Sequence, residues 1–190
     1  MELSIISPER IVAEYKAKGW ENVICYGMGS TLDDVKNAAA AEMNIVCSAA
    51  AIKAAEYLKE KFGTPYEIEY PQSCLPEEIV QKADNFTDKN VLVIHNQTAA
   101  DAVRKLITEK SGKCHCTSAT FFMQKKELSQ QSDFFLADES DLCDNVGDNY
   151  DVVIADKALR CVMKNFSGEF IDFPHFGLSG RLLQGESEKI

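Results

Sequence analysis

Long hydrophobic runs are missing from this sequence, and their absence sets the first limits. No apolar stretch approaches the roughly 20 residues that a membrane-spanning helix needs. The first residues also lack the basic region followed by an apolar run that marks a secretory signal. We therefore expect no membrane association and a cytoplasmic location.

Positive charge is scarce as well. Twenty Lys and Arg residues stand against 30 Asp and Glu residues, which gives a net charge of -10 at neutral pH. Binding to nucleic acid or to an anionic membrane surface relies on clustered Lys and Arg side chains. The charge balance therefore argues against both classes of partner.

Several catalytic signatures are absent. The sequence has no Gly-x-Ser-x-Gly nucleophile elbow. The turn at Gly27–Thr31 could present its amides to a phosphate, but it has neither a third glycine nor a Walker lysine. The seven cysteines are odd in number and show no disulfide spacing, which indicates reduced thiols, most of them buried as small apolar side chains.

What the sequence does contain is a regular alternation of helical and strand-like segments. Such alternation predicts a parallel sheet with helices packed on it. In the first part we expect helices from Ser7, from Thr31 into the alanines and over 50–61, with strands at 22–26, 44–48 and 66–70. In the second part we expect helices at 76–86, from Thr98 to Gly112 and at 157–164, with strands at 90–95, 114–122, 134–137, 150–155 and 169–173.

A break in this alternation falls at Pro71–Pro76. Two prolines within six residues interrupt both helices and strands. We therefore expect two domains, residues 1–73 and residues 74–190. The predicted fold class is α/β, with two Rossmann-like lobes whose parallel sheets are flanked by helices.

Four residues stand at the ends of predicted strands, where α/β sheets usually bind ligands. Cys47 ends the strand at 44–48, and His95 ends a fully apolar strand. His175 follows the last strand, and Gly29 belongs to a turn between strand and helix. We expect these residues to line a crevice between the lobes. A cysteine and a histidine, Cys47 and His175, could together hold a metal centre there.

Three stretches of the first part stand out: the helix start Thr31-Leu32-Asp33-Asp34, the strand Asn44-Ile45-Val46 and the helix end Phe62-Gly63-Thr64-Pro65-Tyr66. They resemble segments in the middle domain of nitrogenase component 1-type oxidoreductases. Lys89–Ile94 and Tyr150–Ala155 resemble strands of the last Rossmann-like domain of that superfamily. The chain thus resembles the C-terminal portion of a nitrogenase molybdenum-iron protein subunit.

The resemblance implies an oxidoreductase that holds an iron–sulfur or iron–molybdenum-type cluster, or a reducible substrate, between its lobes. It implies Cys47 as a thiolate ligand and His175 as an imidazole ligand, and it places Gly29 and His95 at the same site. A partner subunit and an iron-protein electron donor are implied too.

Catalysis by this chain alone is not expected, because the family's N-terminal cluster cysteines lie outside it. The alternative is a non-catalytic cofactor carrier, an assembly scaffold or a small-ligand-binding module.

Overall fold

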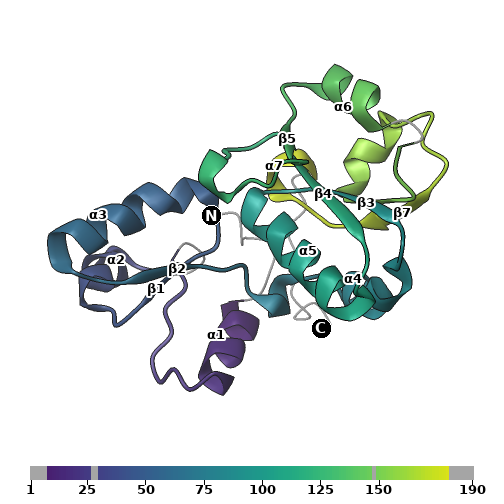
Figure 1. Ribbon diagram of the computed structural model, residues 1–190. Helices are drawn as coiled ribbons and strands as arrows, with labels where there is room; N and C mark the ends of the chain where they lie inside the picture. Colours follow the sequence, from purple (N-terminus) through teal and green to yellow (C-terminus); the bar gives the residue numbers. More distant parts are fainter. Residues whose placement is uncertain (1–7, 27–29, 147–148, 180–190) are drawn as a thin grey trace, which may run out of the picture.

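The computed structural model describes residues 8–26, 30–146 and 149–179, and it contains two parallel sheets (Figure 1). The smaller sheet pairs β1 with β2, and the larger one has the order β5-β4-β3-β6-β7. Every recorded strand pair is parallel. Helices flank both sheets, so the predicted α/β class is confirmed.

The first part of the chain builds the smaller sheet and the helices around it, where η denotes a short 3-10 helix. Its elements are α1 (Pro8–Ala17), α2 (Leu32–Lys36), η1 (Asn37–Ala40), β1 (Asn44–Val46), η2 (Ala49–Ala51), α3 (Ile52–Phe62), β2 (Tyr66–Ile68) and η3 (Gln72–Cys74). Thr31 caps α2 in a capping box with Asp34, as the sequence predicts. Gly63 ends α3 with a φ of 75°, a left-handed conformation that favours glycine.

The second part builds the five-stranded sheet. Its elements are α4 (Glu77–Lys82), η4 (Ala83–Phe86), β3 (Asn90–Ile94), α5 (Gln97–Ser111), β4 (His115–Thr120), η5 (Lys126–Leu128), β5 (Phe134–Phe135), α6 (Glu139–Val146), β6 (Val152–Ala155), η6 (Lys157–Cys161), β7 (Glu169–Asp172) and α7 (Phe176–Ser179). In Figure 1, α4 and α5 lie on one side of the sheet and α6 on the other.

Strands β3 and β6 are apolar at every buried position because both faces of the sheet are covered. Val91 and Val93 of β3 join the core that includes α5, whereas Leu92 and Ile94 join the core that includes α6. Successive strand side chains point to opposite faces, which explains this alternation. The apolar side chains of the single strand β3 therefore contribute to both cores.

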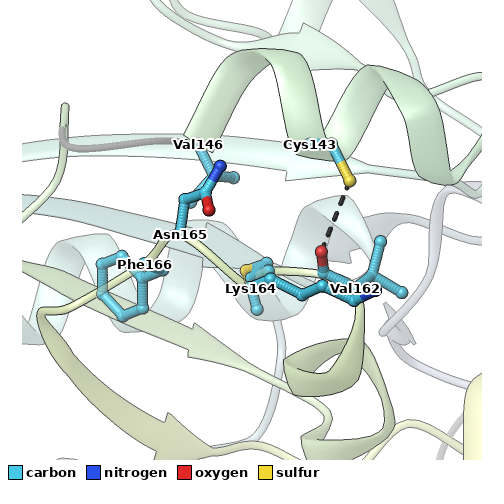
Figure 2. A pocket seen from close by; sticks show the side chains of 7 residues that line it. Cys143, Val146, Val162, Lys164, Asn165 and Phe166 are labelled. Carbon is cyan, nitrogen blue, oxygen red and sulfur yellow. Dashed lines mark hydrogen bonds between the residues drawn. The ribbon is translucent and has the colours of Figure 1, made fainter.

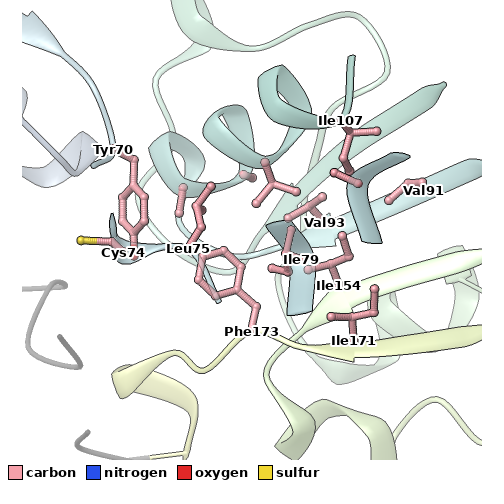
Figure 3. Packing of buried hydrophobic residues seen from close by; sticks show 14 of the residues in the cluster. Tyr70, Cys74, Leu75, Ile79, Val91, Val93, Ile107, Ile154, Ile171 and Phe173 are labelled. Atoms are coloured by element: carbon pink, nitrogen blue, oxygen red, sulfur yellow. The ribbon is translucent and has the colours of Figure 1, made fainter. Parts of the chain in front are cut away.

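Helix α1 packs against the second part of the chain as well as the first. Ile11 and Tyr15 of α1 belong to the same buried cluster as Ile79 and Phe173. Figure 3 shows how that cluster continues from Tyr70 at one end to the strands of the large sheet. The domain boundary near residue 73 stays a prediction, and the apolar packing runs across it.

One predicted strand is wrong. Residues 22–26 form no strand, and β1 pairs with β2 alone among the described residues. Val23 and Cys25 pack against the α1 core, while Ile24 and Tyr26 are 48% and 41% exposed. The segment therefore buries part of its apolar surface by packing against the core that includes α1, and not by pairing its backbone with a strand.

Two details of the helices also differ from expectation. Asn96 caps α5, because its side chain accepts a hydrogen bond from the Ala99 amide, and Thr98 lies inside the helix. The expected helix at 157–164 is the short 3-10 helix η6, which Asp156 caps. Asparagine and aspartate side chains readily accept hydrogen bonds from backbone amides, and these two caps set where each helix starts.

Every helix in the described part of the chain falls short of the length and apolarity needed to cross a bilayer.

Candidate functional site

The order in which the strands are added to the large sheet reverses between β3 and β6. From β3 the chain continues to β4 and β5 on one side, and it then crosses to β6 and β7 on the other. Such a switch point opens a crevice at the carboxyl ends of the strands, where α/β proteins bind ligands. His95 follows β3 and Asp156 follows β6, so both lie at this edge.

His95 is fixed on several sides. Its side chain is 1% exposed and its ring stacks on Phe173, with centroids 4.0 Å apart and an angle of 18°. The Nε2 atom lies 3.2 Å from the Pro174 carbonyl oxygen. A carbonyl can only accept, so Nε2 carries the ring proton and Nδ1 carries a lone pair. That Nδ1 atom is buried and has no hydrogen-bond partner in the described part of the chain.

His175 lies next to His95, with ring centroids 4.7 Å apart in an edge-on arrangement. It stacks on Phe122 at 3.9 Å and is 3% exposed. The Gly177 amide donates to Nδ1 at 3.1 Å, so the neutral ring carries its proton on Nε2. Among residues 8–26, 30–146 and 149–179, this Nε2 atom also has no hydrogen-bond partner, and it is buried. The structure thus brings together the two predicted histidines.

Asp156 holds the segment that contains His175. Its Oδ2 atom accepts from the His175 amide at 2.8 Å and from the Ser179 hydroxyl at 2.7 Å, and its side chain is fully buried. Its Oδ1 atom accepts from the Ala158 amide. Sequence reasoning missed Asp156. The available signal was an aspartate directly after a strongly apolar strand.

Burial controls the charge of both histidines. Loss of hydration, with a smaller contribution from the neighbouring His175, lowers the pKa of His95 to about 3. Burial lowers the pKa of His175 to about 4, although Asp156 acts in the opposite direction. Both rings are therefore neutral at physiological pH.

Cys47 follows β1 at the edge of the smaller sheet. Its carbonyl oxygen accepts a short hydrogen bond from the Thr98 hydroxyl at the start of α5. Burial raises the pKa of the Cys47 thiol to about 12, and the nearby thiols of Cys74 and Cys25 add to the rise. The thiol is thus protonated in this state.

The four predicted site residues are only partly brought together. The contacts recorded for His175 reach His95, whereas those recorded for Cys47 reach Thr98 and neither histidine. Gly29 lies outside the described residues. Within residues 8–26, 30–146 and 149–179, no group of three or more His, Cys, Asp or Glu side chains could hold a metal ion.

Two cavities are candidates for ligand binding. The larger holds about 850 Å³ and lies beneath α1, with Cys47 in its wall. The smaller, shown in Figure 2, holds about 180 Å³ beside α6. Small-molecule sites usually span about 300–1,000 Å³. The thiol of Cys143 in the smaller cavity already donates to the Val162 carbonyl at 3.4 Å. The larger cavity is therefore the stronger candidate.

Comparisons with known proteins define the fold class. No family model matches this chain, and no curated protein sequence matches it. Among solved structures, the chain is similar to nitrogenase Cp1 at pH 6.5, with a TM-score of 0.55 and 13% sequence identity. The match covers 91% of this chain and 50% of that one, so this chain spans half the length of its structural neighbour. The chain therefore has a nitrogenase-like α/β fold.

Proposed function

We propose that this chain acts as the C-terminal portion of a nitrogenase component 1-like subunit. The observation that carries the proposal is the fold likeness, which extends over 91% of the chain despite 13% identity. In this role the chain holds a metal–sulfur cofactor or a reducible substrate between its lobes. It works with a partner subunit and an iron-protein electron donor.

A cluster, when bound, would supply electron storage and transfer. Cys47 would hold it through its sulfur, and His175 through a ring nitrogen. One observation supports these roles: Cys47 borders the 850 Å³ cavity.

Both donors would have to change before they could bind a cluster. Burial keeps the Cys47 thiol protonated, and the Nδ1 lone pair of His175 accepts a hydrogen bond from the Gly177 amide. Loading would require Cys47 to lose its proton and the His175–Gly177 hydrogen bond to break.

Anaerobic reconstitution tests the proposal. The chain is purified without oxygen and supplied with iron and sulfide, and bound metal is measured by elemental analysis and visible absorption. We expect stoichiometric iron in the wild type and its loss in Cys47→Ala and in His175→Ala. Cys161→Ala is the matched control, because Cys161 is an exposed thiol on η6. A colourless, metal-free wild type would contradict the proposal that this chain binds a cluster.

A second candidate function is a module that binds a small ligand without catalysis. The volume of the cavity beneath α1 favours it, since this space matches that of small-molecule sites in general. Ligand that persists after Cys47→Ala would support this candidate over the first.

A further inference from the structure

The cavity beneath α1 has both a wide apolar wall and a small number of polar anchors. Its wall is formed by one side of α1, by residues 19–26 and by residues 37–51. Trp20 and Ile45 provide partly buried apolar surface in this wall. The combination of apolar surface and few polar groups is typical of sites for small organic molecules.

Two side chains of the wall each carry a buried polar atom that has no hydrogen-bond partner among the described residues. The Tyr15 side chain is 5% exposed, and its hydroxyl is buried without a hydrogen bond. The Nδ2 atom of Asn44, at the start of β1, is also buried without one. Both side chains line the cavity. Buried polar groups are almost always paired in folded proteins, so two unpaired donors in one cavity indicate a missing acceptor.

The charges around the cavity restrict what that acceptor can be. Glu21 and Glu42 line the cavity, and Glu14 and Glu69 act electrostatically on Tyr15. The Lys18 ammonium lies 4.4 Å from the Tyr15 ring centroid, but it is already paired with Glu14 and Glu69. Acidic surroundings of this kind repel an anion. A carboxylate or phosphate is therefore disfavoured, and a neutral oxygen acceptor fits.

We propose that this cavity binds a neutral, flat organic molecule whose carbonyl oxygen accepts hydrogen bonds from Tyr15 and Asn44. The body of the molecule lies against Trp20 and Ile45. The proposal gives a ligand class to the second candidate function and rests on it. It does not require a metal centre.

Titration with prodan, a neutral aromatic ketone whose emission reports its surroundings, tests the proposal on the full, metal-free chain. We expect saturable binding to the wild type. Tyr15→Phe keeps the ring and removes only the hydroxyl, so its Kd should rise about tenfold, the loss expected for one good hydrogen bond. Tyr57→Phe is the control, because Tyr57 is 54% exposed on α3 and does not line the cavity.

A second measurement separates binding from folding. Without ligand, Tyr15→Phe should unfold at the wild-type temperature or above, because it removes a hydroxyl that has no partner. Ala41→Trp, which fills the cavity wall, should abolish the saturable signal.

Absence of saturable binding to the wild type, or equal Kd values for the wild type and Tyr15→Phe, would overturn the proposal. Neither outcome changes the iron measurement that compares the wild type with Cys47→Ala. Failure of the small-ligand proposal can therefore be told apart from failure of the cluster proposal.

Discussion

His95 and His175 are buried as a neutral pair, edge to face, with an aromatic ring stacked on each. Their depressed pKa values follow from lost hydration, and protonating either ring would place a charge beside the other. The stability of the protein should therefore depend on pH below neutrality.

The sign of this dependence follows from proton uptake. Unfolded histidine titrates near pH 6.5, whereas the folded rings titrate at about 3 and about 4. Between these values the unfolded chain binds more protons than the folded one. The free energy of unfolding therefore has its full value above pH 6.5 and falls as the pH drops toward 4. At pH 5 each ring should account for about 2 kcal/mol of lost unfolding free energy.

Urea denaturation at pH 7 and pH 5 measures the loss. His95→Phe keeps a ring for stacking and should remove the share due to His95. His115→Gln, at an exposed position of β4, should leave the pH dependence as it is in the wild type. An equal loss in His95→Phe and wild type would contradict the assignment.

At the scale of single residues, the positions of His95 and His175 after strands led us to expect both rings at one sheet edge, and the rings do lie side by side. Their role in a functional site stays a prediction. Asp156 was missed because its role depends on the return of residues 175–179 over the edge, which no local pattern encodes. The roles of Cys47 and Gly29 stay predictions.

Helix caps determine where the elements at this edge begin. Asn96 accepts from the Ala99 amide at 2.9 Å and from the Thr98 hydroxyl at 2.9 Å, while Thr98 also reaches the Cys47 carbonyl. One buried side chain thus starts α5 and positions the residue that connects it to β1.

Removing this cap should be costly. Asn96→Ala should lower the unfolding free energy by about 1 to 2 kcal/mol, because it leaves a buried amide donor at the start of a fifteen-residue helix unpaired. Thr31→Ala removes a similar cap from exposed, five-residue α2 and should have a smaller effect. Urea denaturation of both variants makes the comparison. A larger loss for Thr31→Ala would show that the buried cap is not the more important one.

At the scale of elements, helix ends were predictable because Gly63 and Gly112 carry strong local signals. Apolar strands at β3 and β6 were predictable because a continuous buried run has few other uses. The error at residues 22–26 has a physical basis. Apolar residues there can be buried either by strand pairing or by packing on a helix, and the sequence does not distinguish the two.

Across the whole molecule, α1 connects the two parts. Ile11 and Tyr15 are both 5% exposed and share a core with residues of the large sheet. The apolar face of α1 therefore belongs to a core that residues of both parts build.

Truncating that contact should destabilise the protein. Ile11→Ala should lower the unfolding free energy by about 3 kcal/mol, as a buried large-to-small substitution does. Leu32→Ala is the matched control, because Leu32 is 81% exposed on α2 and its truncation should change little. Thermal or urea unfolding provides the measurement, and near-equal midpoints for the two variants would refute the shared core.

The smaller sheet has a consequence for how the chain would respond to a ligand. β1 and β2 pair over only three residues each, and a two-stranded sheet has little stability of its own. The region that walls the cavity is therefore among the parts that open most readily. Occupancy of the cavity would be coupled to local order, and protection of the β1 amides from hydrogen exchange would rise with ligand concentration.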